Sequence, residues 1–252
     1  MNDAVTPGGQ RLRSGTQTMS GALPEAVRYH RYLYDRLSGA LGRRVWEIGA
    51  GHGQYTDLLL EDGREVLASD VDTEMVAGLQ ARRHGYRERL SVAQVDLRDE
   101  RSITDCASWL PDSVLCLNVL EHIPEDERAV GWLHRHLPAG CRAVFLTPAL
   151  PALYGFMDSE AGHVRRYTRK SLAGVFSRAG WAIEKDFYMN PVGGLGWFFR
   201  NRIAPPSARE LDSPRVNDDI RFFDRYLVPL TRALDPLFAP VFGQSVVVVA
   251  RR

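Results

Sequence analysis

Short apolar runs of strand length alternate with amphipathic, helix-length stretches along most of this chain. Apolar runs of strand length occur at 44–48, 65–69, 91–95, 114–118, 142–147, 182–188 and 245–250. Helical patterns occur at 26–40, 55–61, 73–84, 126–136 and 170–179. This alternation is typical of the βαβ units that build a parallel sheet. We therefore predict an α/β fold with a seven-stranded, mostly parallel sheet.

The segment 189–243, between the last two predicted strands, is too long for an ordinary connecting loop. It is also rich in aromatic residues, among them Trp197, Phe198 and Tyr226. We predict a helical insertion that packs over the carboxyl edge of the sheet. Residues 1–21 contain no continuous apolar stretch and are rich in Gly, Ser and Thr. They are predicted to be a flexible leader, which leaves one domain over 22–252.

Composition and charge narrow the classes of function. Of the 252 residues, 44% are hydrophobic and 25% are charged, which suits one large soluble domain. Lys and Arg number 32 against 31 Asp and Glu, so no global field attracts nucleic acid. The three cysteines form no CxxC pair, and no apolar run approaches the roughly 20 residues of a membrane span. We expect a cytoplasmic protein that acts on a small molecule.

A glycine-rich turn follows the first predicted strand, and it carries the strongest chemical signal. Glu47 ends the apolar run, and Gly49, Gly51 and Gly53 come next at alternate positions. Glycine allows positive φ and close approach of a ligand, and the following helix offers free N–H groups. A dinucleotide fingerprint needs a third glycine where Gln54 stands. The turn therefore favours a nucleoside that carries an amino acid, whose ammonium Glu47 can receive.

Polar residues also follow the next three predicted strands. Asp70 ends the second strand, where a carboxylate can accept hydrogen bonds from both hydroxyls of a ribose. Asp96 ends the third, where it can accept from an adenine amine, with Val71 and Leu97 sandwiching the ring. The fourth strand ends in Asn118–Ile123. Ends of parallel strands meet at one edge, so these residues predict one binding crevice.

These segments resemble the cofactor motifs of class I S-adenosylmethionine-dependent methyltransferases. The chain is similar in particular to small bacterial members that carry LNVLEHI, here within 117–123, and a GHxRRYT loop, here 162–168. The resemblance runs from about Tyr29 to the end of the chain. It implies a Rossmann-like fold with an antiparallel last strand. It also implies S-adenosylmethionine as cofactor and methyl transfer to an oxygen, nitrogen or carbon atom.

The resemblance further implies how the cofactor is bound. Its methionine part would contact the glycine turn and Glu47, with Tyr29 closing over that end. Its ribose would contact Asp70, and its adenine would contact Val71, Asp96 and Leu97. Asn118 and Val119 would lie beneath the sulfonium.

Candidate acceptor-side residues come mainly from the GHxRRYT loop. We consider His122, His163 and Tyr167 as general bases. Arg165 and Arg166 are candidates for binding an acceptor carboxylate or phosphate. Alternatively, this is a structural loop in which one arginine pairs with Asp158 or Glu160.

Three residues further along the predicted crossovers are candidates for lining the acceptor pocket, namely Tyr154, Tyr188 and Asn190. Aromatic residues at such positions are more often part of the core. Asp158, Glu160 and His163 lack diagnostic ligand spacing, so no metal site is predicted.

Two other functions are compatible with the pattern. A nicotinamide-dependent oxidoreductase would use a related sheet, although the glycine spacing argues against it. A non-catalytic partner subunit would retain the methyltransferase fold. Because related enzymes can accompany glycosyltransferases, association with one, or with other biosynthetic enzymes, is expected by analogy.

Overall fold

The computed structural model describes residues 22–82, 85–86, 88–202 and 214–252, so the predicted leader lies outside the described residues. A single seven-stranded sheet has the order β3-β2-β1-β4-β5-β7-β6. Strand β7 is antiparallel to both neighbours, and the β1–β5 pairs are parallel. The strands are β1 (Arg44–Ile48), β2 (Glu65–Asp70), β3 (Leu90–Gln94), β4 (Ser113–Leu117), β5 (Arg142–Pro148), β6 (Ala182–Met189) and β7 (Ser245–Arg251). The predicted sheet is confirmed, including the antiparallel last strand.

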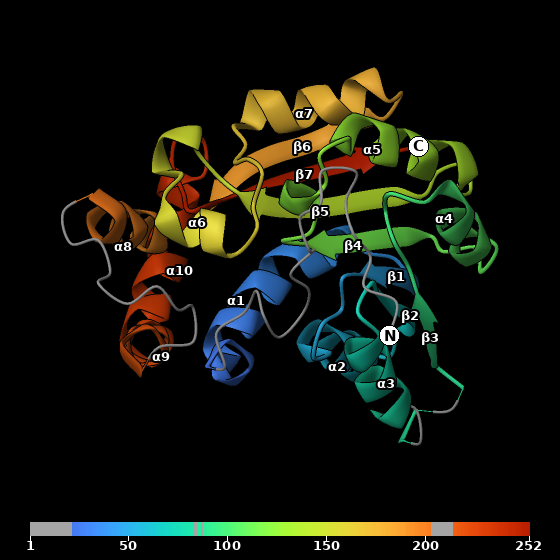
Figure 1. Cartoon of the computed structure of the whole chain (residues 1–252), viewed down its shortest axis with the longest axis horizontal. Coiled ribbons are helices and arrows are strands. Elements are labelled where there is room, and N and C mark those ends of the chain that lie inside the picture. The colour runs from blue at the N-terminus through green and yellow to red at the C-terminus, as the bar shows by residue number, and fades with distance from the viewer. Residues whose placement is uncertain (1–21, 83–84, 87, 203–213) are drawn as a thin grey trace.

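Helices cover both faces of the sheet (Figure 1). One layer contains α1 (Val27–Leu37), α2 (Gln54–Glu61) and α3 (Thr73–Arg82), and the other contains α4 (Glu100–Ala107), α5 (Asp126–His136) and α7 (Arg169–Arg178). The central strands are apolar on both sides, as expected for a covered parallel sheet. Trp46 and Phe145 face one hydrophobic cluster, whereas their neighbours Val45 and Val144 face the other.

Helix α4 has no counterpart among the predicted elements. It begins after Asp99, whose carboxylate accepts the Arg101 N–H at 3.0 Å and caps the helix. Its buried residues are Ile103, Cys106 and Ala107, at the spacing of one helical face. The helix has only eight residues, and polar residues separate these positions. Such a short periodic pattern is easily missed in a sequence.

The segment between β6 and β7 is helical where it is described. Helix α8 spans Pro191–Arg202, α9 spans Pro214–Phe222, the π-helix η7 spans Phe223–Leu227, and α10 spans Val228–Phe238. These helices lie together at the end of the sheet where β6 ends, beside α1 (Figure 1). None of the helices in the described ranges has the length and apolarity needed to cross a bilayer.

A buried polar junction ties this insertion to the domain. Asp235 of α10 accepts a hydrogen bond from the Tyr32 hydroxyl at 2.5 Å and another from the Asn190 N–H at 2.9 Å. The three residues come from different parts of the chain: Tyr32 from α1, Asn190 from the end of β6 and Asp235 from α10. Buried polar groups of this kind remain stable only when paired. The junction therefore fixes α10 against the carboxyl end of the sheet.

Candidate functional site

The glycine turn after β1 forms the floor of the site. Gly49, Gly51 and Gly53 have φ of 74°, 52° and 82°, a region that other residues adopt only at a cost. The N–H of Gly49 donates to the Ser69 carbonyl at 2.8 Å. A Cβ on Gly49 would lie 2.2 Å from Cγ2 of Val119, so the turn packs directly against the chain leaving β4. The ends of β1, β2 and β4 thus meet here.

Glu47 lies at the buried end of this turn. Its carboxylate accepts a hydrogen bond from the Thr56 hydroxyl at 2.5 Å. Burial raises the pKa of Glu47 to about 8, although the Thr56 hydrogen bond works in the opposite direction. Near neutral pH the side chain is therefore largely protonated. An ammonium group placed beside it would restore the charged form, so Glu47 fits a ligand with an amino group.

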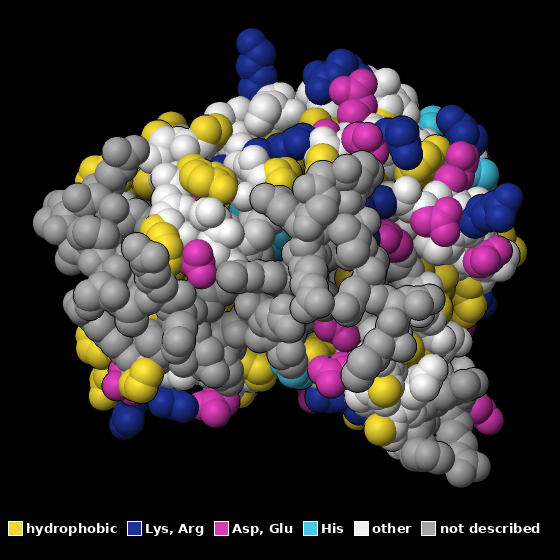
Figure 2. Space-filling model, viewed as in Figure 1, with side chains coloured by type: hydrophobic (Ala, Val, Ile, Leu, Met, Phe, Trp, Pro, Cys, Tyr) yellow, Lys and Arg dark blue, Asp and Glu magenta, His cyan; other side chains and the backbone are white. Residues whose placement is uncertain are grey.

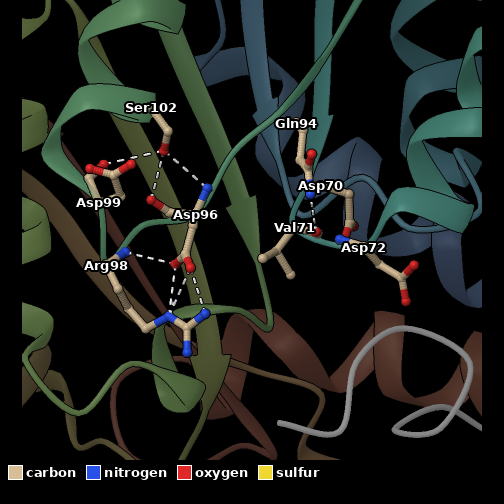
Figure 3. Close-up of polar contacts among 8 residues, drawn as sticks. All are labelled: Asp70, Val71, Asp72, Gln94, Asp96, Arg98, Asp99 and Ser102. Atoms are coloured by element: carbon tan, nitrogen blue, oxygen red, sulfur yellow. Dashed lines mark hydrogen bonds and ion pairs between the residues drawn. The ribbon is translucent and has the colours of Figure 1, made fainter. Parts of the chain in front are cut away.

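Asp70 and Val71 extend the site along the end of β2. Asp70 accepts the Gly51 N–H at 2.9 Å on Oδ2 and the Asp72 N–H at 3.0 Å on Oδ1. Burial raises its pKa, and these hydrogen bonds partly counteract the rise. The Val71 side chain is 44% exposed and lies between Asp70 and the group around Asp96 (Figure 3). An exposed apolar side chain beside a fixed carboxylate suits a nucleoside.

Asp96 after β3 is held by its neighbour Arg98 (Figure 3). The Nε of Arg98 donates to Asp96 Oδ1 at 2.8 Å, and its backbone N–H donates to the same oxygen at 2.9 Å. Partial burial tends to raise the pKa of Asp96, but the hydrogen bonds and charge of Arg98 hold it below its usual value. The carboxylate is thus ionised and fixed in orientation.

Leu97 differs from Val71 in its exposure. Only 3% of Leu97 is exposed, and it belongs to the hydrophobic core with Val95 and Ile103. The Leu97 side chain packs into the core and Val71 supplies the exposed apolar surface, while the sandwich of an adenine between the two stays a prediction.

A compact polar cluster follows β4. Glu121 and His122 lie in the short 3-10 helix η5 (Leu120–His122), and His163 comes from the loop after α6 (Phe156–Glu160). The Nε2 of His163 lies 3.9 Å from Oε1 of Glu121, and its Nδ1 lies 2.8 Å from Oδ1 of Asp158. The two imidazole rings meet edge to face with centroids 4.9 Å apart. Two of the three predicted bases are therefore neighbours.

The two arginines of the GHxRRYT loop are paired within the protein. Arg166 is buried and donates to Asp158 at 2.7 Å, with its guanidinium over the Trp197 ring. Arg165 forms an ion pair with Asp126 at 2.6 Å. The predicted binding of an acceptor carboxylate or phosphate is thus not supported by this geometry. The alternative, a structural loop with one arginine paired to Asp158, describes it better.

Three further acceptor-side candidates have partners within the protein. Tyr167 donates its hydroxyl proton to Asp126 at 2.6 Å, and burial together with this hydrogen bond raises its pKa, so it is a poor base. Tyr188 is buried, and its hydroxyl accepts the Arg169 N–H at 3.3 Å. Asn190 is fully buried; its amide nitrogen donates to Gln244, just before β7, and its amide oxygen accepts the Gly193 N–H. All three stabilise the fold.

Tyr154 and Tyr29 retain positions suited to a ligand. Tyr154 is 39% exposed, and its hydroxyl donates to the His163 carbonyl at 2.8 Å. Tyr29 is half-buried, with its ring 6.0 Å from that of Phe223 in the insertion. Its backbone N–H donates to Asp224 at 2.7 Å. Tyr29 therefore lies in α1 and contacts the insertion.

Sequence reasoning gave no site role to Arg98 or Glu121, and it considered Asp158 chiefly as a partner for an arginine. The signal for Arg98 is weak, because an arginine two residues after an aspartate is common on surfaces. Glu121 precedes His122 in the quoted motif, and Asp158 stands five residues before His163. Their significance depends on burial and proximity, which spacing alone does not reveal.

Comparison with known proteins agrees with this geometry. A family model described as a methyltransferase domain matches residues 24–186. A ubiquinone biosynthesis O-methyltransferase from Alkalilimnicola ehrlichii is 32% identical over 172 residues, covering 65% of this chain and 68% of that protein. A protein of the same name from Xylella fastidiosa is 31% identical over 193 residues, covering 72% of each.

Solved structures share the fold at low identity. An S-adenosylmethionine-dependent methyltransferase from Mesorhizobium loti has a TM-score of 0.56 at 18% identity, covering 88% of this chain and 98% of that one. Phosphoethanolamine N-methyltransferase 2 of Haemonchus contortus, solved with S-adenosyl-L-methionine, has a TM-score of 0.58 at 16% identity, covering 89% of this chain and 52% of that one.

Proposed function

Because this chain belongs to the methyltransferase domain family, with S-adenosylmethionine as its cofactor, we propose that it methylates a hydroxyl oxygen of a small-molecule acceptor. The choice of oxygen is supported by the relatives named as O-methyltransferases at 31–32% identity. Family membership removes the basis for the oxidoreductase and non-catalytic alternatives. The expected association with a glycosyltransferase finds no support in these relatives and stays a hypothesis.

The observation behind the cofactor assignment is that the carboxyl ends of the four neighbouring parallel strands β1 to β4 lie at one edge of the sheet. We assign Glu47 and the turn at 49–53 to the methionine part of the cofactor, because a buried carboxylate and backbone N–H groups suit an amino acid. Asp70 is assigned to the ribose, and Val71 with Asp96 to the adenine. Asn118, at a φ of 54°, and Val119 would lie beneath the sulfonium. The residues present fit this cofactor in both charge and polarity.

The chemistry demands little beyond alignment and proton removal. S-adenosylmethionine supplies a methyl group already activated by a positively charged sulfur. The protein must hold the acceptor oxygen in line with that methyl and exclude water. A phenolic hydroxyl has a pKa near 10, so its proton must be removed or its pKa lowered. The cluster of Glu121, His122 and His163 begins three residues after Asn118, and we assign it to the acceptor side of the sulfonium.

The acceptor is proposed to be selected by residues outside the segment that the family model matches. The matched residues end at 186, before α8, α9 and α10. Tyr29 and Tyr154 lie within the matched segment; the ring of Tyr29 is next to Phe223 of the insertion, and the exposed ring of Tyr154 is proposed to contact the acceptor. Charged side chains of both signs are interspersed on the described part of the face in Figure 2, which suits a small acceptor better than a nucleic acid. A cytoplasmic location fits the three cysteines, all free and buried.

The direct test incubates the full chain with S-adenosylmethionine labelled in its methyl group and a panel of phenols, catechols and matched amines. We expect labelled methyl ethers from at least one phenolic class, with one S-adenosylhomocysteine formed per methyl transferred. Asp70→Asn should slow this transfer at subsaturating cofactor, because the amide nitrogen that replaces one carboxylate oxygen cannot accept a hydrogen bond from the cofactor's ribose. Transfer confined to nitrogen or carbon acceptors, by a chain that binds the cofactor, would refute the oxygen assignment.

A further inference from the structure

Glu121 is a buried carboxylate without a hydrogen-bond partner among the described residues. It is 0% exposed, and neither Oε1 nor Oε2 has a hydrogen-bond partner among the described residues. Burying an ionised carboxylate without compensation is costly, and folded proteins normally pair such a group or use it to bind a metal. The position therefore calls for a cation or a proton.

Two imidazoles complete a set of three donors around the same point. Glu121, His122 and His163 each offer a ligand atom, and these atoms lie within 4.8 Å of one another. The Nε2 of His163 lies 3.9 Å from Glu121 Oε1. Ligands of one tetrahedral zinc ion, at bond lengths of about 2.1 Å, stand about 3.4 Å apart. Small side-chain rotations would bring the three donors to that spacing.

The other nitrogen of each imidazole is already engaged. Nδ1 of His163 lies 2.8 Å from the buried Asp158 carboxylate, and Nδ1 of His122 lies 3.2 Å from the Gly162 carbonyl. Metal-bound histidines usually donate their second N–H to a carboxylate or a backbone carbonyl in this way. With both Nδ1 atoms protonated, both Nε2 atoms carry the lone pair that a metal requires.

Of the two buried carboxylates in this cluster, Asp158 has a cationic hydrogen-bond donor and Glu121 has none. Asp158 is neutralised by Arg166, whose Nε donates to it at 2.7 Å. The buried arginine of the loop thus supports the histidine–carboxylate pair and leaves the Glu121 charge available.

We propose that Glu121, His122 and His163 bind one divalent first-row transition-metal ion, with Asp158 and the Gly162 carbonyl orienting the histidines. Two imidazoles and one carboxylate favour such an ion over Mg²⁺ or Ca²⁺, which prefer oxygen ligands. Three protein ligands leave at least one position for an exogenous oxygen.

The role of the ion in catalysis, unlike its binding, rests on the proposed function. An acceptor hydroxyl bound at the open position would have a lowered pKa, because the cation stabilises its oxyanion. The proton would then leave to solvent or buffer, and the acceptor oxygen would form the new bond to the methyl carbon as the carbon–sulfur bond breaks. The metal ion would thus take over the role that was predicted for Tyr167 as a base, because the Tyr167 hydroxyl donates its proton to Asp126.

The test measures metal binding directly, on tag-free full chain that has been treated with a chelator and dialysed. Calorimetric titration with Zn²⁺ should show one ion per chain, Mg²⁺ should bind far more weakly, and Co²⁺ should give visible absorption bands of a nitrogen- and oxygen-ligated site. Glu121→Gln preserves the side-chain shape and should weaken Zn²⁺ binding at least about ten-fold. Because its carboxylate is unpartnered, this variant should fold and melt no lower than the metal-free wild type.

Glu100→Gln is the matched control. Glu100 also pairs with a histidine, His136, at 2.9 Å, but on the surface and with Arg135 as a second partner. This variant should retain the wild-type affinity for Zn²⁺. Equal Zn²⁺ affinity in wild type, Glu121→Gln and Glu100→Gln would overturn the proposal, as would a wild type that binds no Zn²⁺ or Co²⁺.

The metal site and the methylation of a hydroxyl oxygen can be refuted independently of each other. Methyl transfer to a phenol by a chain that binds no metal would remove the metal site and leave the proposed function intact. Stoichiometric Zn²⁺ binding that Glu121→Gln weakens at least about ten-fold, by a chain that methylates only nitrogen or carbon acceptors, would support the metal site and refute the oxygen assignment.

Discussion

Replacing Gly49 with alanine separates backbone strain from side-chain collision at the cofactor turn. Gly49 has a φ of 74°, and its new Cβ would lie 2.2 Å from Cγ2 of Val119. The positive φ alone costs about 1–2 kcal/mol, and the overpacking adds about 1–3 kcal/mol. We therefore expect Gly49→Ala to lower the free energy of unfolding by about 2–5 kcal/mol. Cofactor affinity should fall as well, because relieving the collision moves the turn.

Gly63 provides the matched control for this experiment. It lies in the turn before β2 with a φ of 78°, and a Cβ added there would meet no described atom within 4 Å beyond its chain neighbours. Gly63→Ala should cost only the backbone part, about 1–2 kcal/mol, and should leave cofactor affinity unchanged. Urea unfolding measures the stabilities, and calorimetric titration with S-adenosylmethionine measures the affinity.

A double-mutant cycle with Val119→Ala tests the collision itself. With the Val119 methyl groups removed, the cost of Gly49→Ala should fall to that of Gly63→Ala. Equal destabilisation by the two glycine substitutions in the wild-type background would refute the reasoning. A cost of Gly49→Ala that Val119→Ala does not change would refute it equally.

Three shorter predictions follow from the site. Because the folded-state pKa of Glu47 is about 8 against an ordinary 4.5, the folded protein holds an extra proton between these values; stability from this group falls as pH rises through that window and is constant above it. Glu47→Gln should flatten this dependence of stability on pH, as measured by urea unfolding. It should also abolish the proton release that accompanies cofactor binding near pH 7, as measured by calorimetric titration in buffers of different ionisation enthalpy. An unchanged pH dependence of stability would contradict the assignment. Tyr167→Phe should cost about 1–2 kcal/mol by leaving Asp126 without this hydrogen bond, with kcat/KM nearly unchanged; a hundred-fold loss of kcat would restore Tyr167 as a base. Arg98→Ala should weaken cofactor binding several-fold by releasing Asp96, and unaltered affinity would show that Arg98 has no positioning role.

The sheet could be predicted from the sequence because each strand is marked by a pattern of apolar residues within its own few positions. Strand β1 and helix α5 have the predicted bounds, and the strand-end residues Glu47 and Asp70 fall at one edge because parallel strands require it. The exposure of Leu97 could not be predicted, since an apolar residue at a strand end can face either the core or a ligand.

The acceptor side was harder to predict because its contacts are long-range. Adjacent arginines suggest an anion site, but Arg166 turns inward to Asp158 and Arg165 pairs with Asp126. No local pattern encodes these ion pairs. Likewise, the importance of Glu121 follows from complete burial without a partner, which only the folded chain reveals.

The most direct test of the central claim is a calorimetric titration of S-adenosylmethionine into wild type, Asp70→Asn and Asp72→Asn. Asp72 provides the control, because its side chain instead accepts the Glu74 N–H at 2.8 Å at the start of α3. The account predicts that the wild type binds, that Asp70→Asn loses at least about ten-fold in affinity from a charge-assisted contact, and that Asp72→Asn binds like the wild type. A wild type that does not bind, or equal affinity in all three proteins, would contradict it.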